Sequence, residues 1–405
     1  MTLIRPTAEA AHASAAARRQ ATRRAVAVLA LVTVAALIPL LGPRTALTDT
    51  GEAAAPGTGG IALLRTVLFA ALCVPAGELF AARLARRVPG APPVDPPRGW
   101  ATYAAAAGFI VALGLASVVA TGNLLPRHLS DMDVGGLYQS RDGRLALLEV
   151  NAFAAAWICA RSRRPAAQAW PLAAVVLAEA LRAHPATEPG APVGSALTLV
   201  HVTCAALWAG GLLYVLRLLR GWRAAEGEPT RAWTAVTTGP GTAVTTGPGT
   251  AMTTGPGATD PTGPGTAMTT GPEPGEPTGP GTADPTGPGA AGGSAAGAAL
   301  LGLYARVAAV LFAAITATGV WSALRRMPPA TMVDQLTSTA YGRTLLAKVL
   351  LVAAVAVLAL WARLRLRRAR DPLSACSPAR AEIVALGVVV AMSGLLTALP
   401  LPIRW

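Results

Sequence analysis

The sequence predicts an all-α fold, a polytopic bundle of about nine transmembrane helices. Hydrophobic residues make up 53% of the 405 positions and charged residues only 13%, whereas an ordinary soluble domain carries about 25% charged residues. The apolar residues gather in runs, most of them close to the ~20 residues that cross a bilayer as a helix. Short clusters of arginine separate the runs. These observations favour membrane helices over a large soluble core.

The runs follow one another in two groups. The first run comes directly after a basic tail, and five more follow it through short loops. The last three come after a long polar segment. The fourth and fifth runs are the shortest, so the basic residues between the runs must decide the count. The nine predicted spans are Ala25–Leu41, Ile61–Leu84, Trp100–Gly122, Leu145–Ala160, Ala169–Arg182, Gly194–Leu219, Ala298–Leu324, Thr344–Arg363 and Ile383–Leu399.

The arginines indicate which ends of these spans face the cytoplasm. With the N-terminus in the cytoplasm, the predicted inner segments hold 22 arginines and the predicted outer segments hold nine. Loops on the cytoplasmic side of a membrane carry the excess of basic residues. We therefore expect residues 1–24 to form a cytoplasmic tail and the C-terminal PLPIRW to lie outside.

The first run has an alternative interpretation as the apolar part of a signal peptide behind a basic region. No A-x-A cleavage site follows it in LLGPRTALT, and this favours a retained span. Either interpretation leaves the other spans in the same orientation.

A repetitive segment divides the chain. Residues 234–293 repeat TTGPGTA-like units, and such Gly/Pro/Thr sequence buries too little apolar surface to fold. We expect a six-span part at residues 25–222, a disordered cytoplasmic linker at 223–297 and a three-span part at 298–405.

Several function classes are disfavoured by composition and motifs. The net charge of +14 comes from arginines scattered in short clusters rather than on one basic face, so nucleic-acid binding is not indicated. The four cysteines form no CxxC pair, which argues against a disulfide framework or a zinc site. The sequence contains no nucleophile elbow, HExxH or phosphate-binding loop. An enzyme is therefore not expected.

Ionisable residues inside the predicted spans form a distinct group. A charge at mid-membrane costs about 2.5–3.5 kcal/mol on insertion scales, so each requires a reason. In the predicted orientation, five of them share the outer portion of the bundle: Arg65, Glu149, Glu179, His201 and Lys348. Two interpretations stand. The groups pair with one another to assemble the helices, or they line a polar vestibule open to the outside.

Candidate metal ligands lie at the same end of the bundle. His128 and Met132 occur in the outer loop RHLSDMDVGG, and His184 ends the fifth span. Imidazole binds copper, and thioether favours Cu(I). With His201 in the sixth span, these residues form the predicted metal set, although the spacing makes no compact metal motif.

Two segments carry a resemblance to a known family. LVHVTCAALWAGGLLYV, with His201, Trp208, Gly210 and Gly211, is similar to a signature span of the copper resistance protein D (CopD) family. The segment YGRTLLAK, with Tyr341, Gly342, Arg343 and Lys348, resembles a second and more specific motif of that family. His201, Cys204, Trp208 and Gly211 also fall on one helical stripe, so they are expected to face a common neighbour.

The resemblance implies a polytopic protein of the bacterial cytoplasmic membrane that carries copper ions into the cell. It also implies cooperation with an extracytoplasmic copper-binding protein of the CopC type. Two alternatives remain open. One is a copper-handling assembly factor or sensor without transport, and the other is a b-type cytochrome, for which helix histidines are scarce.

Lys348 stands out because the other 33 basic residues are all arginine. A desolvated lysine can lose its proton, whereas an arginine cannot. We hypothesise that Lys348 is a compact counter-ion for Glu149 or Glu179, or a gate that repels an extra cation.

Overall fold

The computed structural model describes residues 8–52, 57–91, 97, 99–122, 128, 133–184, 190–237, 288–326, 331–368 and 376–399. These residues contain helices and no strands, which confirms the predicted all-α class. The longer helices are α1 (Ala8–Leu47), α2 (Thr58–Ala85), α3 (Ala101–Thr121), α5 (Arg141–Arg161), α6 (Ala169–Ala183), α7 (Ala191–Thr237), α8 (Pro288–Arg326), α10 (Ala340–Arg368) and α11 (Cys376–Leu396). The short ones are α4 (Val134–Gln139), α9 (Met332–Ser338) and a 3₁₀ turn at Pro165–Gln168.

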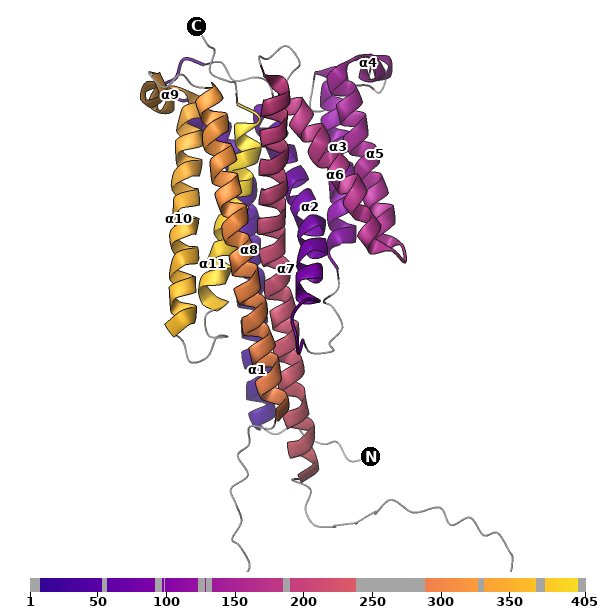
Figure 1. Ribbon diagram of the computed structural model, residues 1–405, viewed down its shortest axis with the longest axis vertical. Helices are drawn as coiled ribbons and strands as arrows, with labels where there is room; N and C mark the ends of the chain where they lie inside the picture. Colours follow the sequence, from indigo (N-terminus) through magenta and orange to yellow (C-terminus); the bar gives the residue numbers. More distant parts are fainter. Residues whose placement is uncertain are drawn as a thin grey trace, which may run out of the picture.

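The longer helices lie side by side along one axis as a membrane-type bundle (Figure 1). Helix α7 occupies the centre, where it packs on α2 and on α8. Helix α2 also contacts α3 and α11, so α2 and α7 connect the two membrane parts. Helices α4 and α9 lie at the end where α11 finishes, opposite the end where α1 begins (Figure 1). That end is the predicted outer face.

Seven helical stretches are long and apolar enough to cross a membrane, and Val384–Leu396 of α11 forms a shorter apolar helix. They match the predicted spans except the fifth, which corresponds to α6 with only 15 residues. Large apolar side chains on their outer surfaces, such as Ile110, Leu350 and Val357, are exposed, as expected for helices that face lipid tails. The count of nine spans and the orientation stay predictions.

Several helices extend beyond their predicted boundaries. Helix α1 begins at Ala8, within the expected tail, because that tail is rich in alanine, the strongest helix former. Helix α5 begins at Arg141, where the Ser140 hydroxyl caps it by accepting from the Gly143 amide at 3.0 Å. The polar first turn of α5 hid this start in the hydropathy pattern.

Helices extend into both ends of the predicted 223–297 linker. Helix α7 continues to Thr237, and α8 begins at Pro288. Arginine, alanine and glutamate after residue 222 favour helix, and they carry α7 beyond its apolar stretch. The remaining repeat segment, 238–287, lies outside the described residues.

Glycines allow α2 and α7 to approach closely. A Cβ at Gly210 would overlap the carbonyl oxygen of Cys73 and contact the Cα of Gly77, and one at Gly77 would overlap the backbone of Gly210. Small residues permit such backbone contact between membrane helices. The Gly77–Gly210 crossing therefore fixes the distance between the two central helices.

A second contact joins three helices near the predicted cytoplasmic side. The Glu78 carboxylate of α2 accepts from the backbone amides of Trp100 and Ala101, at 2.7 and 3.1 Å, and so caps the start of α3. It also pairs with the Arg217 guanidinium of α7 at 2.9 Å, and this guanidinium stacks 3.9 Å from the centre of the Trp100 ring. A carboxylate is stabilising at a helix N-terminus.

The crossing yields a prediction about stability. We expect Gly210→Ala to lower the midpoint of thermal unfolding in detergent. The added methyl group overpacks the interface, which lowers the free energy of unfolding by about 1–3 kcal/mol. Gly221 lies on the same helix, and no atom lies within 4 Å of the position that an added methyl group would take there. Gly221→Ala is therefore the matched control and should not lower the midpoint. Equal midpoints for the two variants would contradict the close crossing.

Candidate functional site

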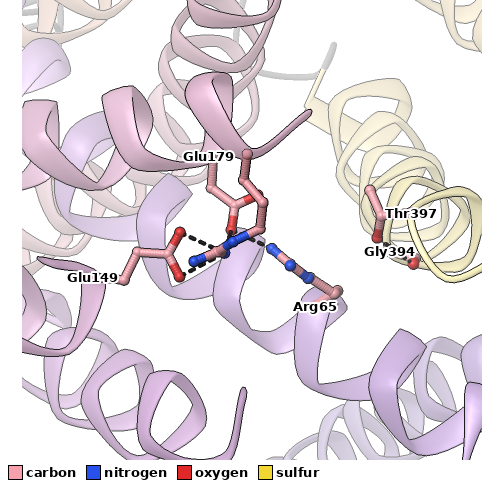
Figure 2. A network of polar contacts seen from close by, with 6 residues as sticks. Arg65, Glu149, Glu179, Gly394 and Thr397 are labelled. Atoms are coloured by element: carbon pink, nitrogen blue, oxygen red, sulfur yellow. Dashed lines mark hydrogen bonds and ion pairs between the residues drawn. The ribbon is translucent and has the colours of Figure 1, made fainter. Parts of the chain in front are cut away.

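Two arginines and two glutamates form a buried network between α2, α5 and α6 (Figure 2). Arg65 of α2 binds Glu179 of α6. Arg182 of α6 donates from one nitrogen to both oxygens of Glu149 of α5, at 2.7 and 2.9 Å, and to Glu179 at 3.2 Å. The side chain of Glu149 is fully buried. The four charges balance, which is the condition under which ionised groups are tolerated away from water.

Arg182 is the member of this network that the sequence reasoning missed. The sequence places it in the outer segments because it ends the predicted fifth span. Its position three residues after Glu179 could have indicated this ion pair, because residues at i and i+3 are neighbours on a helix. In the structure its side chain is only 14% exposed.

The network forms part of the wall of a cavity of about 430 Å³. The cavity lies where α2, α6 and α7 of the first membrane part meet α8, α10 and α11 of the second. Its polar and ionisable lining residues include Arg65, Cys73, Glu179, Arg182, His184, Thr198, His201, Ser322, Tyr341, Lys348, Ser393 and Thr397. The structure thus brings four of the five predicted outer ionisable groups to one cavity, and the fifth, Glu149, lies behind Arg182.

Residues of the second membrane part lie beside the network (Figure 2). Arg65 lies between Glu179 and the end of α11, where Thr397 donates to the carbonyl of Gly394 at 2.8 Å. Helix α11 comes close to α2 because Gly394 leaves room for Thr66. The C-terminal part therefore contributes directly to the surroundings of the buried charges.

His201 is held by a residue from the second membrane part. Its Nδ1 lies 3.0 Å from the hydroxyl of Thr318 in α8. That hydroxyl donates to the carbonyl of Ala314 at 2.7 Å, so its oxygen can accept the Nδ1 proton. In this tautomer the lone pair of Nε2 is available to a metal ion.

His184 is a second imidazole at the same cavity. It is buried, and its Nε2 lies 3.1 Å from the hydroxyl of Thr198 on α7. Arg141 donates to the carbonyl of His184 at 3.1 Å and to that of Leu181 at 2.7 Å. The end of α6 is thereby fixed to the start of α5.

Lys348 also lines the cavity, on α10. Both glutamates bind arginines, and among the described residues Lys348 makes no ion pair with either of them. The geometry therefore does not support the hypothesis that Lys348 is their counter-ion. The arginines take this role because the start of α2 and the end of α6 bring their guanidinium groups to the carboxylates.

The first motif packs helices around His201. Trp208 meets Phe312 of α8 edge to face, with ring centres 5.4 Å apart, and its carbonyl accepts from the Tyr304 hydroxyl at 2.6 Å. Gly211 faces the ring of Tyr304, and Gly210 faces α2. His201, Trp208 and Gly211 thus share α8 as their neighbour.

The second motif serves two purposes. Tyr341 and Lys348 line the cavity. Gly342 gives α9 room to pass, because a Cβ there would overlap the carbonyl of Gln335. Arg343 donates to the carbonyl of Thr337 at 2.7 Å and to that of Thr48 at 2.9 Å, which joins the start of α10 to the end of α1.

Of the other two predicted ligands, His128 and Met132, the structure describes only His128. His128 is exposed and does not line the cavity, and Met132 lies outside the described residues. Cys73 also lines it. Within the described ranges no three His, Cys, Asp or Glu side chains converge as a metal cage.

The network yields a second prediction. Arg182→Met should destabilise the protein by about 3–5 kcal/mol, because it leaves the buried Glu149 carboxylate without its partner. Adding Glu149→Gln should restore most of the loss, since the uncompensated charge is then removed. Thermal unfolding of both variants in detergent measures this. A double variant as unstable as the single one would show that Arg182 acts through packing rather than charge.

Comparison with known families bears on the second sequence motif, YGRTLLAK, which lies within the matched residues, whereas the first motif lies outside them. Residues 298–396, from α8 to α11, match the family model described as Copper resistance protein D. No curated protein and no solved structure matches the chain. The matched residues contribute Thr318, Tyr341 and Lys348 to the site, together with the α11 segment beside Arg65. Within this multi-pass membrane protein, the C-terminal membrane part is thus similar to the copper resistance protein D family, and the match does not extend to the first membrane part.

Proposed function

We propose that this protein carries copper ions across the cytoplasmic membrane of a bacterium, through the cavity between its two membrane parts. One observation carries the proposal: two imidazoles from different helices, His184 and His201, line the same cavity in a protein whose C-terminal membrane part is similar to a copper resistance family. Imidazole is a good ligand for copper. Copper is the cargo in this account, not a resident cofactor.

The cavity offers ligands at successive depths. By position along their helices, His184 lies at the predicted outer end, His201 lies further in, and Cys73 lies near the middle of α2. Cys73 supplies a soft thiol, which favours Cu(I). Separate ligands suit a cargo that must also leave, because transport requires binding that is weak enough for release.

The Thr318 contact gives the C-terminal part a function in copper binding. The hydroxyl that holds Nδ1 fixes the tautomer and orientation of the His201 ring, and such outer partners tune metal affinity. Thr318 and His201 belong to different membrane parts, so copper binding at His201 depends on how these parts meet. An extracytoplasmic CopC-type protein is the proposed donor at the outer end.

The test is copper accumulation in cells that express the full chain under copper limitation. We expect wild type to raise cell copper above an empty-vector control, and we expect His201→Ala and His184→Ala to lose most of that increase. His12→Ala is the matched control, since this histidine belongs to the predicted cytoplasmic tail; it should behave as wild type. Immunoblots of membranes establish equal protein levels.

Wild-type accumulation in His201→Ala, at equal protein level, would reject transport through this site. A different pair of results would indicate an assembly factor instead. Cells with wild type would then hold no more copper than the empty-vector control, and an extracytoplasmic copper enzyme would lose its metal in a strain that lacks this protein.

A further inference from the structure

Among the described residues, the cavity carries one positive charge that no side chain compensates. Four charged side chains line it: Arg65, Arg182 and Lys348 are cationic, and Glu179 is anionic. Glu149 adds a second negative charge through Arg182. Two arginines and two glutamates therefore balance, and Lys348 remains as the surplus cation.

Arg182 has two hydrogen-bond donors for which the described residues supply no acceptor. Its Nε and Nη2 atoms are buried and have no acceptor among the described residues. Buried donors in native proteins are normally paired, so each such group requires an explanation. Since these two atoms are buried, they do not contact the contents of the cavity, and the Lys348 amine is a cationic donor that a ligand there would meet.

The size of the cavity restricts what could supply the missing negative charge. At about 430 Å³, it is far larger than the ~30 Å³ that a water molecule occupies in the liquid. It lies within the range of small-molecule sites, about 300–1,000 Å³. Apolar side chains such as Phe69, Leu72 and Leu345 form much of the remaining wall. A ligand with one anionic group and a small organic body fits this combination.

We propose that the cavity binds a small organic carboxylate, with the Lys348 amine as its counter-charge. A carboxylate accepts several hydrogen bonds in addition to neutralising the charge. The organic body contacts the apolar wall. Binding of the carboxylate does not require copper. It has one consequence that rests on the proposed transport: an anion at Lys348 lowers the electrostatic repulsion that a copper cation meets beside His201.

The experiment is thermal unfolding of the purified full chain in detergent, with acetate as the probe and without copper. A ligand that binds the folded state raises the unfolding midpoint by mass action. Sodium acetate is compared with sodium chloride at equal ionic strength and pH, and with acetamide as the uncharged analogue. We expect acetate to raise the midpoint of wild type above both references.

Variants identify the site. Lys348→Met and Lys348→Gln should weaken the apparent acetate affinity about tenfold or more, as expected for the loss of a charged hydrogen-bond partner. Lys348→Arg should keep the acetate effect, because it keeps the charge. Arg306→Met is the matched control: Arg306 is exposed on α8 and does not line the cavity, so the acetate effect should be unchanged.

Either of two results would overturn the proposal. One is a wild-type midpoint that is no higher in acetate than in chloride or acetamide. The other is an acetate effect that survives in both Lys348→Met and Lys348→Gln. Because copper is absent, these results are separate from the outcome of the accumulation test.

Discussion

The charge balance between Arg65, Arg182, Glu149 and Glu179 is the constraint on which the site depends. In a medium that cannot solvate ions, each of these side chains is tolerated only because the others are in place. Their hydrogen bonds join α2, α5 and α6, and α2 in turn is joined to α7 through the Gly77–Gly210 crossing. The network and the crossing therefore hold the first membrane part as one wall of the cavity.

The second membrane part completes this wall rather than standing apart from it. Helix α8 supplies Thr318 to His201, and α10 supplies Tyr341 and Lys348 to the cavity. The family match covers this part alone, yet the imidazole that it contacts, His201, lies on α7, and His184 follows the end of α6. A copper site in this protein would consequently be a property of both parts, despite the long repeat segment between them in the chain.

Much of the fold follows from composition. The apolar runs predicted the helices, because a bilayer imposes one length and one type of element; the orientation that the arginine clusters indicate stays a prediction. The predicted shared depth of Arg65, Glu179, His201 and Lys348 agrees with their position around one cavity. Helix ends were less predictable, since α1 and α5 begin in polar sequence where caps and helix propensity decide. The partner of each charge is not predictable from the sequence, because pairing depends on side-chain reach. Arg182, at the end of its predicted span, and Arg65 bind the carboxylates that the sequence analysis assigns to Lys348.

The central claim is that the cavity binds copper through His201. X-ray absorption spectroscopy of copper bound to the purified full chain tests it most directly, by comparing wild type with His201→Ala. The account predicts imidazole nitrogen among the copper ligands of wild type and fewer imidazole ligands, or no bound copper, in the variant. An identical spectrum and copper content in both proteins would contradict it.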